Sequence, residues 1–227
     1  MKPKLVFLLL LSVVIISCKK TTIVDVAPSN SGKLIYKLTD DAGKGLPGVA
    51  ISLFAYEGVY SDYQILLDKQ VTDVNGQIDF GDLNPDKYLI RADSVKVNDL
   101  TYVVHEYVEV SVAATTRREV KATDFSAQLT ITVRSYNDEK PMKSVGVMVV
   151  PTNKIYNEYT TASNSKIADY KGVTNSSGLI KIKIPCYKQY KIYLYDLVTN
   201  SGYRIHDVFD FFLEKDEKAN SIMRISP

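Results

Sequence analysis

Apolar and polar residues alternate in short runs along most of this chain. Every second residue from Val49 to Leu53, and again from Val145 to Val149, is Val, Ile or Leu. Such a period of two is typical of β-strands that pack one face on a core. Clusters of Gly, Pro, Asn and Asp separate these runs, and no segment shows an extended apolar period of 3.6 residues. The pattern therefore predicts an all-β fold.

One phrase occurs twice in the sequence. "VTDVNGQIDF" ends at Phe80, and "VTNSSGLIKI" ends at Ile182. The Tyr-led strand that follows keeps the same offset of 102 residues, since Tyr190 follows Tyr88 by that distance. The preceding first strands are offset by only 95 residues. A tandem duplication with one loop insertion produces this register. We expect one domain over residues 33–125 and a diverged copy over 126–227.

The repeated phrase predicts a turn between two strands. Asp73, or the Asn at the same place in the second copy, can accept a hydrogen bond from its own backbone two residues on, and Gly76 supplies a positive-φ position. The alternative is a calcium loop, for which Asp73, Asn75 and Asp79 offer oxygen donors. An EF-hand spacing would need a different Gly position and a Glu at the twelfth residue. The turn is therefore favoured, and no metal site is predicted.

The first twenty residues, "MKPKLVFLLLLSVVIISCKK", combine two lysines, an apolar run and a small residue before Cys18. The run from Leu5 to Ile16 is too short to span a bilayer as a helix but suits a signal peptide. Residues 15–18 resemble the lipobox of bacterial lipoproteins. The resemblance implies a signal peptide over residues 1–17, lipidation of Cys18 and attachment to a membrane. Residues 18–32, rich in Ser, Asn and Thr, are expected to form a flexible tether.

The first repeat carries two longer motifs. "LTDDAGKGLPGVAISL" reads as strand, glycine turn and second strand, and "TDVNGQIDFGDLNPDKYLIRA" follows as turn, strand, loop and strand. Together they resemble the carboxypeptidase-regulatory-like domains of envelope lipoproteins of the Bacteroidetes type. The resemblance is good from Gly32 to Phe125 and looser from Ala127 to Pro227. It implies two tandem seven-stranded, transthyretin-like β-sandwiches, which in that family are mostly accessory or binding modules.

Charge and cysteine content narrow the choice of partners. Removing the two lysines of the signal segment from 28 basic and 26 acidic residues leaves a mature chain with no formal net charge. No basic stripe remains that would attract nucleic acid. With Cys18 lipidated, Cys186 has no cysteine partner within the chain, and a packed thiol is favoured over a reactive one.

The sequence gives no sign of catalysis. His105 and His206 are each followed directly by an acid, and neighbours on a strand point to opposite faces. No nucleophile elbow, phosphate loop or zinc spacing occurs. Lys37 resembles the lysine of pilin isopeptide bonds, but an exposed strand lysine is favoured. We therefore predict no enzyme activity, no catalytic residues and no cofactor.

Tyrosine is the best candidate for recognition chemistry, because its ring offers rigid, amphipathic contact area. The chain has 16 Tyr and no Trp, which counts mildly against a carbohydrate platform. The candidate binding residues lie in or beside the loop after the second strand of each repeat: Tyr56, Tyr60, Tyr63, Tyr156 and Tyr159. Tyr190, Tyr193 and Tyr195 are interpreted as ordinary strand residues. The polar segment from Pro151 to Lys171 is expected to be a solvent-facing loop.

These features favour a non-catalytic lipoprotein that acts as a binding or assembly module at the outer membrane. Its expected partners are the membrane, through the lipid on Cys18, and envelope proteins or surface glycan. The alternative is a structural spacer or an accessory subunit of a glycan or peptide uptake system, and a hydrolase is disfavoured. The last predicted strand ends near Pro227, so the second domain is expected to be the one that carries the binding function.

Overall fold

A computed structural model describes residues 30–56, 64–155, 161–206 and 210–226, and its strands confirm the all-β fold. The strands up to residue 121 form a sheet of order β4-β1-β7 and a sheet of order β3-β2-β5-β6. We call this pair of sheets the first sandwich. Its strands are β1 (Gly32–Thr39), β2 (Ala50–Ala55), β3 (Leu66–Val71), β4 (Gln77–Leu83), β5 (Asp86–Val97), β6 (Leu100–Val110) and β7 (Thr115–Lys121).

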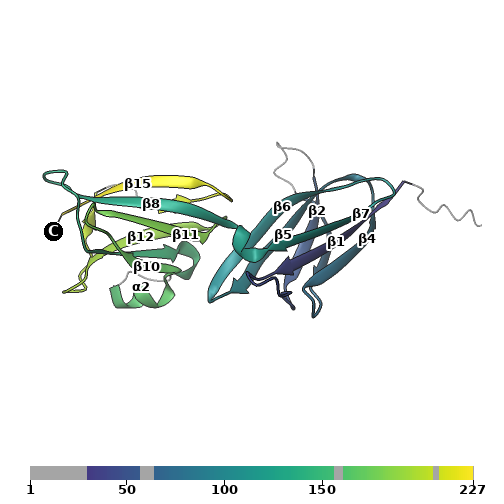
Figure 1. Cartoon of the computed structure of the whole chain (residues 1–227), viewed down its shortest axis with the longest axis horizontal. Coiled ribbons are helices and arrows are strands. Elements are labelled where there is room, and N and C mark those ends of the chain that lie inside the picture. The colour runs from purple at the N-terminus through teal and green to yellow at the C-terminus, as the bar shows by residue number, and fades with distance from the viewer. Residues whose placement is uncertain (1–29, 57–63, 156–160, 207–209, 227) are drawn as a thin grey trace, which may run out of the picture.

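The strands from residue 126 onward form the second sandwich. One sheet has the order β11-β8-β15-β13 and the other the order β10-β9-β12-β14. Its strands are β8 (Ser126–Ser135), β9 (Val145–Pro151), β10 (Tyr170–Val173), β11 (Leu179–Pro185), β12 (Gln189–Asp196), β13 (Arg204–Ile205), β14 (Asp210–Phe212) and β15 (Lys218–Ser226). In Figure 1 the two sandwiches lie end to end, and β1 begins at the pole farthest from the second sandwich.

One segment near the C-terminal end of the chain is divided between two sheets. The stretch "GYRIHDVFDFF" contributes strands to both sheets of the second sandwich. β13 pairs with β15 in one sheet, and β14 pairs with β12 in the other. A stretch with apolar residues on both faces can leave one sheet and join the other, so periodicity alone does not settle its partner.

Three short helical elements complete the described residues: η1 (Ala122–Asp124), η2 (Thr152–Lys154) and α2 (Thr161–Ile167). The last two lie in the segment that was expected to be a solvent-facing loop. That expectation is wrong in part, because Asn164 of α2 is 1% exposed and the side chain of Asp169 is also 1% exposed. In the described residues no helix is long and apolar enough to cross a membrane.

The repeated phrase builds the same hydrogen-bonded device in both sandwiches. In the first, the buried hydroxyl of Thr72 donates to the carbonyl oxygen of Leu46 at 2.6 Å and accepts from the backbone N–H of Val49 at 2.9 Å. The N–H of Gly48, which has a φ of 74°, donates to the carbonyl of Thr72. Thr72 therefore ties the end of β3 to the entry of β2.

The second sandwich repeats this device with different residues. The Thr174 hydroxyl donates to the carbonyl oxygen of Met142 at 2.7 Å and accepts from the N–H of Val145 at 3.0 Å. Ser144 has a φ of 57° and donates its N–H to the carbonyl of Thr174, as Gly48 does in the first copy. We call Thr72 and Thr174 the clasp threonines.

Directly after each clasp threonine the chain turns into the opposite sheet. Asp73 Oδ1 accepts from the backbone N–H groups two and four residues on, at 2.8 Å each, and Asn175 Oδ1 does the same at 2.9 and 3.0 Å. Gly76 and Gly178 have φ of 75° and 69°, and a Cβ there would meet a carbonyl oxygen at 2.3 and 2.5 Å. The turn predicted for the repeated phrase is thus confirmed. The Oδ1 of Asp73 is occupied by two hydrogen bonds inside this turn.

The two sandwiches share one continuous buried cluster. Phe125 is completely buried between them, and its carbonyl accepts from the N–H of Cys186 at 3.0 Å. The ring of His105 on β6 lies 5.1 Å from the ring of Tyr187, in the turn before β12. Packing at this junction therefore orients the second sandwich on the first.

Replacing Thr174 by Val tests the clasp. Val keeps the shape of the side chain but leaves the carbonyl of Met142 and the N–H of Val145 without their partner, so the free energy of unfolding should fall by about 1–3 kcal/mol. Denaturant titration measures this loss. The control Thr115→Val lies on an exposed position of β7 and should change stability by less than about 0.5 kcal/mol. Equal effects of the two variants would show that the clasp adds nothing.

Candidate functional site

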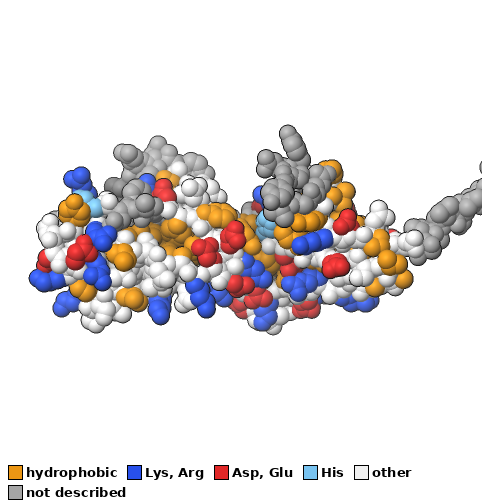
Figure 2. All heavy atoms as spheres, turned by 90° about the horizontal axis from the view of Figure 1, so that it is seen from above, with side chains coloured by type: hydrophobic (Ala, Val, Ile, Leu, Met, Phe, Trp, Pro, Cys, Tyr) orange, Lys and Arg blue, Asp and Glu red, His pale blue; other side chains and the backbone are white. Residues whose placement is uncertain are grey.

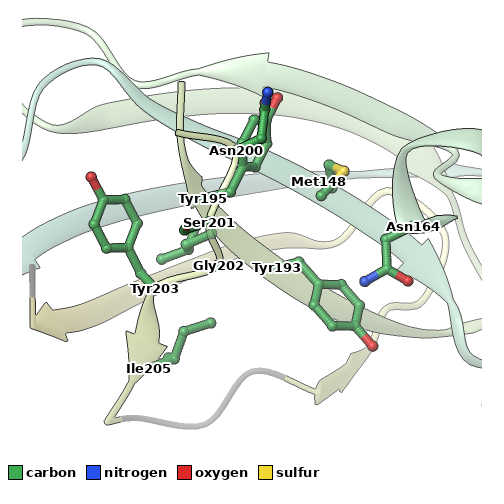
Figure 3. Close-up of a pocket in the computed structure, with 10 residues that line it drawn as sticks. Met148, Asn164, Tyr193, Tyr195, Asn200, Ser201, Gly202, Tyr203 and Ile205 are labelled. Atoms are coloured by element: carbon green, nitrogen blue, oxygen red, sulfur yellow. The ribbon is translucent and has the colours of Figure 1, made fainter. Parts of the chain in front are cut away.

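A pocket of about 370 Å³ lies on the outer face of the sheet β10-β9-β12-β14 (Figure 3). Its floor is formed by Met148 of β9 with Tyr193 and Tyr195 of β12. Asn164 of α2 stands on one side, and the segment from Asn200 to Ile205 stands on the other. The volume is within the range of small-molecule sites, about 300–1,000 Å³. We take this pocket as the candidate functional site.

The alternation of β12 supplies the floor. Tyr190, Ile192 and Leu194 are buried in the core, so the residues between them point outward. Tyr193 and Tyr195 therefore present their rings on the outer face, where each is half-buried. The sequence predicts both as strand residues, and they are, but the structure also places them at the pocket.

A glycine sets the position of one of these rings. Gly146 of β9 pairs with Tyr195 of β12 across the sheet. A Cβ on Gly146 would lie 2.3 Å from the Cζ of Tyr195, so the ring occupies the space that a side chain would fill. The ring is thus held against the backbone of β9, which leaves its opposite face for the pocket.

The wall that follows β12 is built by a network around Asp196. Its Oδ1 accepts from the N–H groups of Val198 and Thr199 at 2.9 and 2.8 Å, and its Oδ2 accepts from the hydroxyl of Tyr203 at 3.0 Å. These hydrogen bonds, first of all that from Thr199, lower the pKa of Asp196. The carboxylate therefore stays ionised at neutral pH, and the wall is formed before any ligand arrives.

The opposite wall is held by a buried carboxylate. Asp169 accepts from Lys154 Nζ at 2.6 Å and from Lys188 Nζ at 3.3 Å, and its second oxygen also accepts from the hydroxyl of Tyr190 at 3.3 Å. Burial lowers the pKa of Lys188 and raises that of Tyr190. Because Lys154 belongs to η2 and Asp169 follows α2, this network fixes both ends of the segment that carries Asn164.

Of the tyrosines chosen as binding candidates, only Tyr56 falls within the described residues. Its ring meets that of Tyr107 edge-on at 5.3 Å, and Lys87 Nζ lies 4.9 Å from its centroid. Tyr56 is therefore packed on the outer face of the first sandwich and is not part of the pocket. The other predicted site residues lie outside the described residues: Cys18, Tyr60, Tyr63, Tyr156 and Tyr159.

The remaining reactive side chains of the described part do not converge on one another. His105 packs on Tyr187, whereas His206 stacks on Tyr136 with ring centroids 4.0 Å apart. Burial raises the pKa of the Cys186 thiol to about 12, as expected of a packed thiol. Among residues 30–56, 64–155, 161–206 and 210–226, no three His, Cys, Asp or Glu side chains could hold a metal ion together.

Surface charge agrees with the near-neutral composition. Figure 2 shows Lys and Arg side chains interspersed with Asp and Glu on the visible face, over both sandwiches. Lys37 forms an ion pair with Glu119 of β7 at 3.2 Å, which fits the exposed strand lysine expected from the sequence. No large field of one sign is present on this face to favour a polyanion.

Comparison with known proteins gives partial likenesses to solved structures of bacterial proteins, two of them pilins. No family model matches the chain, and no curated protein matches it either. The Bacillus anthracis TIE protein has 16% identity and a TM-score of 0.38 over 87% of this chain and 34% of its own length.

Two pilins match over nearly their whole length. The minor pilin GBS52 of Streptococcus agalactiae has 16% identity and a TM-score of 0.37, covering 87% of this chain and 97% of the pilin. The shaft pilin SpaA of Lactobacillus rhamnosus GG has 14% identity and a TM-score of 0.33, covering 87% and 98%. Similarities at this level say nothing about a ligand or an activity.

Asn164 and Tyr203 are pocket residues that the sequence did not reveal. α2 is too short for an amphipathic period, so nothing in "TASNSKI" marked Asn164 as buried. A usable signal existed on β12, where "YKIYLYD" alternates aliphatic with aromatic or charged residues. Tyrosines on the face opposite to Ile192 and Leu194 had to point away from the core.

Replacing Asp169 by Ala tests whether the buried carboxylate holds the α2 wall. The variant leaves Lys188, whose side chain is 11% exposed, without its partner, so the free energy of unfolding should fall by about 3–5 kcal/mol. Thermal or denaturant unfolding measures this. As a control, Asp93→Ala removes an exposed ion pair with Arg91 and should cost about 0–1 kcal/mol. A loss no larger than that of the control would mean that Asp169 does not hold the wall.

Proposed function

We propose that this chain is a lipid-anchored, non-catalytic binding module of the bacterial envelope. In this proposal Cys18 carries the lipid and the segment after it is the tether. The first sandwich is the spacer, and the pocket of the second sandwich is the site of recognition. The proposal extends to the outer membrane as the location, with envelope proteins or surface glycan as partners.

The observation that carries this proposal is the separation between the tethered end and the pocket. β1 begins at the pole of the first sandwich that faces away from the second (Figure 1). β12 starts beside the junction, next to Tyr187, and runs away from it for eight residues, or about 25 Å. The wall from Asn200 to Ile205 follows the far end of β12. An anchored chain would thus hold the pocket beyond the whole first sandwich.

The character of the pocket supports binding over catalysis. Its lining contains no His, Cys, Asp, Glu, Lys or Arg, so the usual metal ligands and, apart from Tyr, the usual proton-transfer groups are absent from it. Tyrosine rings, amides and backbone groups line it instead, which are the groups that recognise small polar molecules. The buried network of Asp169 has a structural role, because it holds the wall that carries Asn164.

The anchor is tested by replacing Cys18 with Ser. A serine cannot form the thioether that attaches the lipid, so the variant should lose labelling by a fatty-acid analogue and leave the membrane fraction or remain unprocessed. Fractionation of labelled cells, followed by detection of the chain, measures both. Ser17→Ala is the matched control, because it keeps a small residue before the cysteine and should be labelled like the wild type.

Equal labelling of Cys18→Ser and the wild type would contradict the anchor. Protease treatment of intact cells then decides the face of the membrane. Cleavage of the chain on intact cells supports exposure to surface glycan or other external partners. Protection on intact cells with cleavage after lysis instead supports a partner inside the envelope.

A further inference from the structure

One residue that lines the pocket carries a buried polar atom without a hydrogen-bond partner. The atom is Oδ1 of Asn164, a residue that is only 1% exposed, so water does not replace the missing partner. In Figure 3 the amide stands at the edge of the pocket, with its nitrogen on the side of Tyr193. A buried acceptor without a partner opposes folding, and a leucine of similar size would avoid that cost. The unpaired oxygen therefore costs stability unless a ligand supplies its hydrogen-bond partner.

A ligand with hydroxyl groups would supply the missing hydrogen-bond partner of the Asn164 amide. A half-turn of the amide about its last torsion exchanges its oxygen and nitrogen at the pocket edge, so the group can accept or donate there. A hydroxyl also both donates and accepts, and therefore matches either orientation. An anion can only accept and an ammonium group can only donate, so each matches one orientation alone.

The other residues of the lining restrict the charge and the shape of the ligand further. No charged side chain lines the pocket, so an ionic ligand would lose its hydration without gaining an opposite charge. The ring of Tyr195, held against Gly146, and the ring of Tyr193 offer flat apolar faces beside the amides of Asn164 and Asn200. Flat apolar faces next to hydrogen-bonding amides fit a ring that is apolar on its faces and hydroxylated at its edge.

We propose that this pocket binds a neutral saccharide, with Asn164 bonding its hydroxyl groups and the tyrosine rings packing on its sugar faces. The proposal rests on the proposed function, because it names the ligand class of the same site. Although the chain has no Trp, Tyr193 and Tyr195 provide the aromatic faces.

Binding is tested with defined probes on the full-length chain, purified in a detergent without a sugar headgroup. The neutral probes are maltohexaose, cellohexaose, xylohexaose and mannohexaose. Hexagalacturonate is the charged saccharide, and a capped (Gly-Ser)₃ peptide is the neutral non-saccharide. Calorimetry and saturation-transfer NMR should show binding of at least one neutral hexasaccharide, and at least tenfold weaker binding of the other two probes. Failure of all four neutral saccharides, or equal binding of hexagalacturonate, would overturn the proposal.

Three variants locate the binding. Asn164→Leu and Tyr193→Ala should each weaken binding of the neutral saccharide at least tenfold, whereas Tyr136→Ala, an exposed tyrosine outside the pocket, should leave it unchanged. Because Leu removes the unpaired Oδ1, Asn164→Leu should also keep or raise the melting temperature. Undiminished binding by Asn164→Leu, or a clear fall in its melting temperature, would contradict the role given to this amide.

The peptide probe separates the two proposals. Binding of the peptide alone, lost in Tyr193→Ala, would reject the saccharide but keep the pocket as the recognition site of an anchored module. Saccharide binding that persists in all three variants would reject this pocket as the site. Failure of the Cys18 experiment, by contrast, affects the anchor and leaves the saccharide result standing.

Discussion

The clasp threonines are the constraint on which the rest of this structure depends. Each one stands where the chain leaves one sheet for the other, and its hydroxyl satisfies a carbonyl and an N–H at the entry of the neighbouring strand, β2 or β9. Because the hydroxyl joins the two segments at a fixed spacing, it sets the register of the sheet. In the second sandwich this register pairs Val173 of β10 with Gly146 of β9, and Gly146 in turn lies opposite Tyr195 of β12 on the floor of the pocket.

The first sandwich shows the same hydrogen bonds, and among its described residues no helix lies between the second strand and the clasp threonine. Between the second strand and the clasp threonine, the second copy carries η2 and α2, and these bring Asn164 and Asp169 onto the sheet. The insertion thus adds a wall to a framework that both copies share. A duplicated scaffold with one modified loop is a common route to a binding site, since the clasp keeps the strands in place while the loop changes.

The sequence predicted the parts of the fold that local chemistry determines. Alternation of β2 and β9 identified strands, and Asp73 with Gly76 identified a turn, because these signals act within a few residues. The placement of β13 and β14 in different sheets escaped prediction, since it depends on which partner strands are nearby. The burial of Asn164 and Asp169 escaped it for the same reason. Their polar side chains suggested solvent, whereas Lys154, Lys188 and Met148 of distant segments surround them.

Hydrogen exchange with and without a saturating neutral hexasaccharide tests the central claim most directly, namely that recognition occurs on the outer face of the second sandwich. The account predicts that the ligand slows exchange of backbone amides in α2 and in residues 193–205, while amides of the first sandwich are unchanged. Protection confined to the first sandwich, for example around Tyr56 and Tyr107, would contradict it. A ligand that binds without slowing exchange at α2 would contradict it as well.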